Sequence, residues 1–140
     1  MYQICYVSRS TADNIQIHND LREIISEARD FNCRNEIYGV LYYADGCFFQ
    51  CLEGDEETVL TLINKLKNDK RHTDIVLFEP KNIDHAHFKD WSMKYVQRSS
   101  KIKLFFSELG ASTFDITLLK QSHIDKLVSC LSECEHIETV

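Results

Sequence analysis

Glycine and proline are scarce in this sequence, which has four glycines and one proline among 140 residues. The glycines stand at positions 39, 46, 54 and 110, too far apart for a G-x-G-x-x-G turn or a P-loop. No G-x-S-x-G segment is present either, so the nucleophile elbow of hydrolases is excluded. We therefore expect neither a phosphate-binding glycine loop nor a serine-hydrolase site.

Long hydrophobic runs and an excess of basic residues are also missing. No apolar run approaches the ~20 residues of a membrane-spanning helix, and the N-terminal MYQICYVS lacks the features of a signal peptide. A net charge of -6 disfavours direct binding of nucleic acid through a basic face. We expect a cytoplasmic protein with no membrane partner and no direct nucleic-acid partner.

The six cysteines include no C-x-x-C pair, so neither a zinc knuckle nor a thioredoxin-type site is expected. Three of them, Cys5, Cys47 and Cys51, fall in strand patterns and are most simply small buried hydrophobic residues. In a cytosolic protein, we expect all six to be reduced thiols.

The histidines do not form a convincing metal site. His85 and His87 have strand-like spacing for two ligands, but they lie in a polar connection without an obvious third ligand. The remaining candidates, His18, His123 and His136, are expected to be solvated on the surface. We therefore expect no bound metal.

What the sequence does contain is a hairpin signal, Asp45-Gly46, between two apolar runs. Asp-Gly suits the two positive-φ positions of a type I′ turn. In the strand before the turn, alternation places Ile37, Gly39, Leu41 and Tyr43 on one face; in the strand after it, Phe48, Gln50 and Leu52 lie on one face. Gln50 is the odd member, because an unpaired buried amide costs about 1–3 kcal/mol. Either another side chain or a bound ligand should meet it.

The order of elements indicates a single mixed α+β domain. A strand around Tyr6 is followed by a helix from about Asn19 to residues 30–32, and by the hairpin. A second helix begins at Asp55, its expected N-cap, and two strands follow at 75–78 and 91–96. This βαββαββ order predicts a ferredoxin-like sheet with two helices on one face.

Two amphipathic helices are expected after residue 98. The first carries apolar residues at 102, 105, 106 and 109 and ends at Gly110, and the second begins near Ser122 with a capping-box pattern. Their apolar stripes should dock on the sheet face that the first two helices leave open.

Polar residues on the apolar elements point to a site. Tyr6 shares the face of its strand with Tyr2 and Ile4, and it can meet Gln50 if the first and third strands are neighbours. Asn32 follows the first helix, and Asp69, Arg71 and His72 lie in a polar loop after the second. From the residues alone, Tyr6 and Gln50 form either a satisfied core pair or part of a ligand site.

The same residues carry a resemblance to a known family. ICYVS around Tyr6, ARDFN ending at Asn32, FFQCLEG, NDKRH and FKDWSMKYV together resemble the BLUF proteins, which are blue-light sensors that use FAD. The resemblance covers the flavin-binding unit at about residues 1–97, and residues 98–140 look like the helical cap of short, stand-alone BLUF proteins. The sequence departs from the family pattern at Tyr38, where a threonine is usual.

The resemblance implies a role for each matched residue. FAD would lie between the first two helices, and Gln50 would bridge its ring and Tyr6. Asn32 would bind the pyrimidine edge of the flavin. The other implied contacts are Ile24, Ile25, Phe31 and Phe48 around the ring, and Asp69, Arg71 and His72 toward the ribose and phosphates.

The resemblance also implies a function, that of a photoreceptor rather than an enzyme. Tyr6 would give an electron and a proton to the photoexcited flavin, and the hydrogen bonds of Gln50 would rearrange. Trp91 and Met93, pointing the same way on the strand 91–96, would pass the signal to the C-terminal helices. The recipient would be a separate effector protein, with a transcription regulator as the leading candidate, or a second copy of the chain. The alternatives are a colourless ferredoxin-like regulatory or interaction domain and a flavin oxidoreductase.

Overall fold

A computed structural model describes residues 1–138 of the chain. The first half of the chain forms β1 (Tyr2–Ser10), α1 (Ile17–Arg34), β2 (Tyr38–Ala44), β3 (Cys47–Gly54) and α2 (Glu56–Lys67). The second half forms β4 (His72–Leu77), β5 (Lys81–Asn82), β6 (Lys94–Val96), α3 (Ser100–Glu108) and α4 (Ile124–Glu133). Two short 3₁₀ turns, Ile116–Leu118 and Gln121–His123, lie between α3 and α4.

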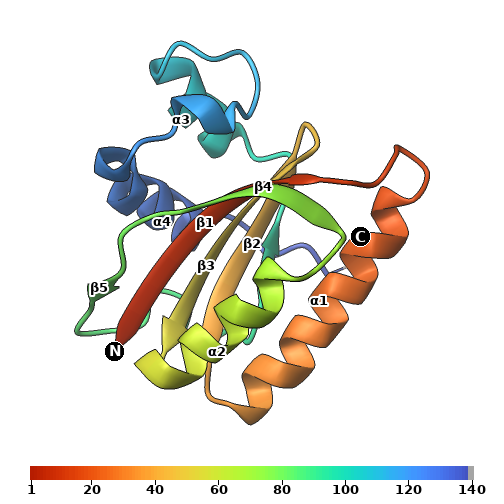
Figure 1. The fold of residues 1–140 in the computed structure, drawn as a ribbon. Helices are drawn as coiled ribbons and strands as arrows, with labels where there is room; N and C mark the ends of the chain where they lie inside the picture. The colour runs from red at the N-terminus through yellow and green to blue at the C-terminus, as the bar shows by residue number, and fades with distance from the viewer. Residues whose placement is uncertain (139–140) are drawn as a thin grey trace.

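The strands form one sheet in the order β4-β1-β3-β2-β6, and β5 pairs with the start of β1. Pairing is antiparallel except between β2 and β6, which run parallel. Figure 1 shows α1 and α2 on one side of the sheet and α3 and α4 on the other. The predicted mixed α+β architecture is confirmed, including the docking of the C-terminal helices on the second face.

Two apolar clusters follow the strand alternation that the sequence predicted. Leu41, Phe48 and Leu52 pack with α1 and α2, whereas Val40 and Phe49 pack with α3 and α4. Burial of apolar surface on both faces stabilises the sheet at about 25 cal/mol per Å². Every residue of β3 is buried, so this strand is the centre of the protein.

The predicted turn and caps are confirmed. Asp45 and Gly46 have φ angles of 52° and 78°, as a type I′ turn requires. Asp55 caps α2 by accepting a hydrogen bond from the backbone N–H of Thr58 at 3.3 Å. Gly110 follows α3 with a φ of 90°, which a glycine adopts without strain.

Several predicted boundaries were wrong. Helix α1 extends to Arg34, so Asn32 lies inside its last turn rather than after it. His72 begins β4 instead of lying in the preceding loop, and β5 was not predicted. Ser122 does not cap α4, because it lies within a 3₁₀ turn that leads directly into the helix.

The predicted strand 91–96 was also too long, since β6 spans just Lys94–Val96. The backbone of the residues before β6 makes hydrogen bonds outside the strand ladder. Trp91 O accepts a hydrogen bond from the N–H of Gly39 at 3.3 Å, and the N–H groups of His87 and Phe88 donate to the side chain of Glu53. Period-two alternation therefore does not apply to Trp91 and Met93.

The approach of strands at Gly39 leaves no room for a side chain. A Cβ atom there would lie 2.6 Å from the carbonyl oxygen of Cys51 and 3.5 Å from Cε of Met93. Gly39→Ala should therefore lower the free energy of unfolding by about 1–3 kcal/mol, as overpacked core substitutions do. Urea denaturation measures the change, with Ser107→Ala on the exposed side of α3 as a neutral reference. An unchanged midpoint for Gly39→Ala would contradict the close approach.

Candidate functional site

Tyr6 and Gln50 form a buried pair at the centre of the sheet. They are register partners on β1 and β3, they are 4% and 2% exposed, and the Tyr6 hydroxyl donates a hydrogen bond to Oε1 of Gln50. Burial, with the nearby charge of Asp69, raises the pKa of Tyr6, so its phenol stays protonated. Within the described chain, Nε2 of Gln50 donates no hydrogen bond. The amide therefore has one end bound to Tyr6 and the other end free.

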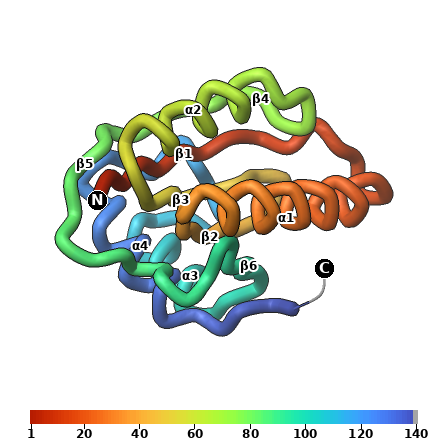
Figure 2. The backbone as a smooth tube through the Cα atoms, turned by 90° about the horizontal axis from the view of Figure 1, so that it is seen from below, coloured from red at the N-terminus to blue at the C-terminus, as the bar shows by residue number. Residues whose placement is uncertain are grey.

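A groove of about 460 Å³ opens above Gln50, between α1 and α2. This volume lies in the range of cofactor sites. Its apolar wall is made by Ile24, Ala28, Phe31, Leu62 and Leu66, and its rim by Glu23, Glu27, Lys65, Asp69 and Arg71. Figure 2 shows the two helices running along the same face of the sheet.

A small hollow adjoins this groove near Tyr6. It is lined by Tyr6, Leu41, Phe48 and His72, and it shares Ile24, Leu66, Asp69 and Arg71 with the groove. The structure thus brings together all but two of the predicted contact residues around one depression. The exceptions are Ile25, which is 4% exposed in the core, and Asn32.

Asn32 is fully buried at the end of α1. Its Nδ2 donates to the carbonyl oxygen of Ser92 at 2.6 Å, but its Oδ1 has no hydrogen-bond partner among the described residues. An unsatisfied buried acceptor costs about 1–3 kcal/mol. Such an atom calls for a donor that the described chain does not provide.

Arg71 is fixed at the rim of the groove by carboxylates. Its guanidinium donates to Asp69 at 2.7 Å and to Glu27 at 2.6 Å, and Glu23 lies 3.6 Å away. The hydrogen bond to Asp69 raises the pKa of Arg71. Although burial alone would raise the pKa of Asp69, its hydrogen bonds with Arg71 lower it. Both groups are therefore charged, and the guanidinium has a fixed orientation.

His72 is held on both sides of its ring. Nε2 lies 2.6 Å from the carbonyl oxygen of Leu66, and Nδ1 lies 2.8 Å from the hydroxyl of Ser8. A carbonyl oxygen accepts only, so Nε2 carries the hydrogen in the neutral ring and Nδ1 accepts from Ser8. The ring meets Tyr6 edge-on at 5.8 Å between centroids, and this contact helps to fix the phenol.

Trp91 and Met93 lie in different surroundings, contrary to the prediction. Met93 is 1% exposed in the cluster that faces α1, whereas the half-buried Trp91 stacks on His136 at 4.2 Å between centroids. His136 was wrongly expected in solvent, since its side chain is 7% exposed. Sequence gives no signal for this contact, because it joins positions 45 residues apart in loops.

Glu53 is a buried carboxylate that the sequence analysis missed. It accepts hydrogen bonds from the backbone N–H of His87 at 2.8 Å and of Phe88 at 3.1 Å, and from Nε2 of Gln3 at 2.9 Å. The available signal was a charged residue at the end of the largely apolar run FFQCLEG. Nδ1 of His87 also lies 2.8 Å from Oε2 of Glu53. Within residues 1–138, no group of three His, Cys, Asp or Glu side chains is placed to hold a metal ion.

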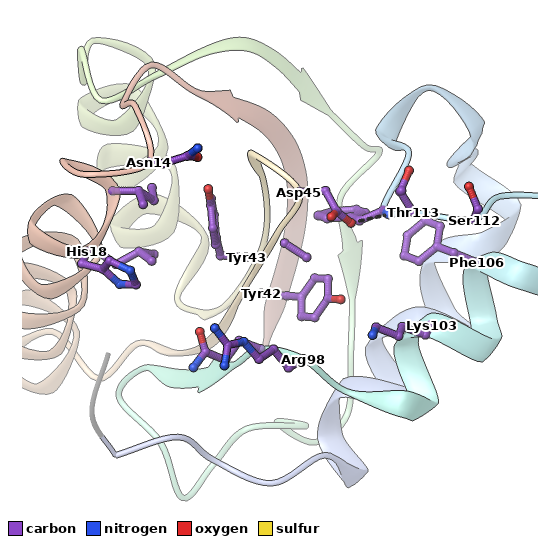
Figure 3. Close-up of a pocket in the computed structure, with 15 residues that line it drawn as sticks. Asn14, His18, Tyr42, Tyr43, Asp45, Arg98, Lys103, Phe106, Ser112 and Thr113 are labelled. Carbon is purple, nitrogen blue, oxygen red and sulfur yellow. Dashed lines mark hydrogen bonds between the residues drawn. The ribbon is translucent and has the colours of Figure 1, made fainter.

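Tyr38, where the sequence departs from the pattern that it resembles, points away from the groove. Its side chain packs against the cluster on the side of α3 and α4. A second hollow, of about 540 Å³, lies between the hairpin tip, α1 and α3 (Figure 3). Its lining is largely polar and includes Asn14, His18, Tyr42, Tyr43, Arg98 and Lys103. None of the predicted contact residues line it.

Comparison with known proteins decides the family. The model described as "Sensors of blue-light using FAD", BLUF, matches residues 1–94. The chain belongs to the BLUF family. The predicted resemblance is thereby confirmed, and the family to which this BLUF chain belongs is one of blue-light sensors that use flavin.

Relatives of this BLUF chain differ greatly in length. The structure of BlsA in its ground state is 44% identical, with a TM-score of 0.93, and the match covers 99% of this chain and 93% of that one. The photoactivated adenylate cyclase subunit beta of Euglena longa is 32% identical over 91 residues, which is 64% of this chain and 10% of the relative. The blue light- and temperature-regulated antirepressor BluF of Escherichia coli strain K12 is 28% identical over 102 residues, or 69% and 25%. The chain therefore matches a tenth to a quarter of these curated relatives.

No helix within residues 1–138 of this BLUF chain is both long and apolar enough to span a membrane.

Proposed function

We propose that this BLUF chain binds FAD in the groove between α1 and α2 and senses blue light through Tyr6 and Gln50, without enzymatic activity of its own. The observation that carries the proposal is the buried Tyr6–Gln50 pair, whose free amide end lies at the floor of the groove. A satisfied core pair would have no reason to border an open groove of cofactor size.

The polar groups around the groove fit the edges of a flavin. Among the described residues, Oδ1 of Asn32, which is buried outside the lining of the groove, is an acceptor without a donor. At the floor of the groove, Gln50 is bound through Oε1 alone, so its Nε2 remains available as a donor. A flavin pyrimidine ring has both N–H and C=O groups. Apolar contacts to the ring would come from Ile24, Phe31 and Phe48, with Ile25 behind them.

Arg71, Asp69 and His72 are assigned to the ribose and phosphate end. Arg71 carries a permanent planar charge that suits a phosphate, and Lys65 stands on the same rim. Glu23 and Glu27 surround this charge, so we expect them to share Arg71 with the phosphates rather than to release it.

The residues of the chain provide the switch. A bound flavin supplies the blue-light absorption and, when excited, a strong oxidant. Tyr6 would serve as the electron donor to the bound flavin, and its phenolic proton would leave along the hydrogen bond to Oε1 of Gln50. Because an amide has a donor end and an acceptor end, rotation or tautomerisation of Gln50 exchanges the groups that it presents to Tyr6 and to the groove.

The output is assigned to β6 and the C-terminal helices. Met93 borders the flavin side of the sheet, and the next residue, Lys94, points to the other side. There its ammonium donates to the carbonyl oxygens of Leu131 at 3.0 Å and Ser132 at 3.1 Å, at the end of α4. Residues 98–140 would thus act as a helical cap that responds to β6, in a relay that shifts a two-state element.

The recipient would be a separate effector protein. One relative is called a blue light- and temperature-regulated antirepressor, a name that describes action against a repressor. By this analogy, a transcription regulator is the leading candidate, and a second copy of the chain is the alternative.

The test is a light-minus-dark absorption spectrum of the purified protein, followed by chromatographic identification of the extracted flavin. We expect a yellow protein that releases FAD and shows a red shift under blue light that reverses in darkness. FMN as the extracted flavin would contradict the proposal that the groove binds FAD. A colourless protein would favour a regulatory domain without flavin, and turnover of NADH without a red shift would favour an oxidoreductase.

A further inference from the structure

The outer edge of β6 is covered by the end of the chain. Tyr95 donates its backbone N–H to Nδ1 of His136 at 3.0 Å, and its carbonyl oxygen accepts from the N–H of Ile137 at 2.8 Å. Residues 134–138, here called the strap, therefore occupy the hydrogen-bonding groups that an edge strand offers to another strand. Figure 2 shows this segment passing beside β6.

One contact of the strap is poorly matched. Burial, reinforced by the charge of Arg29, lowers the pKa of His136, so its ring is neutral and carries one hydrogen. Since Nδ1 accepts from Tyr95, the hydrogen is on Nε2, which lies 3.2 Å from Nη2 of Arg29. Two donors face each other there, and the nearest carboxylate, Glu138, is 4.0 Å from Nε2.

An acidic residue would fit this position better than His136 does. A carboxylate can accept from both the Tyr95 N–H and the Arg29 guanidinium, as charge-assisted hydrogen bonds. A hollow of about 540 Å³ borders the strap and is lined in part by Arg98 and Lys101. Glu133 and Glu135 line the same hollow, so its charges are mixed, and the cationic group that faces another donor at the edge is Nη2 of Arg29, beside His136. The hollow has room for the side chains of a second segment.

We propose that the outer edge of β6 is a docking site for an extended acidic segment of a partner protein, which pairs with Tyr95, places a carboxylate on Arg29 and displaces the strap. Addition of a strand to a free edge gives affinity through backbone hydrogen bonds, and flanking groups give specificity. The strap remains in place without a partner because its attachment to α4 gives it a high effective concentration.

The proposal is tested with a fluorescein-labelled peptide of residues 132–140 that carries C134S and H136D. The protein variant Ile137→Pro removes the N–H that donates to Tyr95, and should bind this peptide about tenfold more tightly than the wild type. Glu135→Pro is the matched control, because Cys134 already has the extended ψ of 156° that a following proline requires. It should bind the peptide as the wild type does.

A second peptide and a second variant keep the test decisive. The peptide with H136K in place of H136D should bind Ile137→Pro at least about tenfold more weakly, because lysine repels Arg29. His136→Ala, which removes the stacking on Trp91 without a proline, should also bind the acidic peptide more tightly than the wild type. Equal binding by wild type and both variants, or equal binding of the two peptides, would overturn the proposal. Dimers of Ile137→Pro in light scattering would also overturn it, since a second copy would then be the occupant.

Discussion

Tyr6→Phe abolishes the light-induced red shift while the flavin stays bound. The phenol donates the hydrogen bond to Oε1 of Gln50, and phenylalanine keeps the ring that packs on His72 but has no proton or readily removed electron to give. The substitution removes only the hydroxyl of a buried residue, which is 4% exposed, so the packing around the aromatic ring is retained. Difference spectra before and after illumination measure the effect, and flavin content is measured in the same samples.

The matched control for this variant is Tyr42→Phe. Tyr42 is 3% exposed and packs on the opposite side of the sheet, against Phe114. Tyr42→Phe therefore removes the hydroxyl of an equally buried phenol that does not border the groove. The red shift of this variant should remain normal. A normal red shift in Tyr6→Phe would refute the role of Tyr6 as the donor.

Glu53→Ala has the largest expected effect on stability, a loss of about 3–5 kcal/mol in the free energy of unfolding. The carboxylate is fully buried, and its removal leaves Nε2 of Gln3 and the backbone N–H groups of His87 and Phe88 without their acceptor. Chemical denaturation of the dark protein gives the value.

Glu57→Ala, on the exposed side of α2, serves as the reference and should change stability by about 0.5 kcal/mol or less. A loss of similar size in both variants would show that Glu53 does not hold the connection between β5 and β6. The N–H groups of residues 87 and 88 lose their acceptor in Glu53→Ala, so their hydrogen exchange should also increase. These residues lie in the connection that leads to Trp91 and Met93.

The strands that surround Tyr6 and Gln50 could be predicted from local pattern. Asp45-Gly46 sets the register of the hairpin, and alternation then fixes which side chains share a face. Gln50 stands out because an amide among buried phenylalanines needs a partner. The neighbouring position of β1 and β3 follows from the ferredoxin-like order, and the register pair Tyr6–Gln50 bears it out.

The environment of the signalling residues could not be predicted in the same way. Trp91 precedes a strand of three residues, and its position depends on Gly39 and on a histidine near the far end of the chain. Alternation applies only where a ladder holds the backbone, so it failed there. The contacts of Glu53 and His136 each join a strand to a loop that is distant in the sequence, and no periodic pattern marks them.

The strands on either side of the hairpin are held very unequally. β1 pairs with β3 along its length from Tyr2 to Arg9, whereas β6 pairs with β2 from Lys94 to Val96 alone. Fewer ladder bonds must break for β6 to slide than for β1, so β6 is the more easily displaced of these two strands, while the frame that carries Tyr6 and Gln50 stays rigid. This difference favours movement in the strand that lies next to Met93, the end of α4 and the strap. A small hydrogen-bond change can therefore be converted into movement without loosening the phenol and amide that produce it.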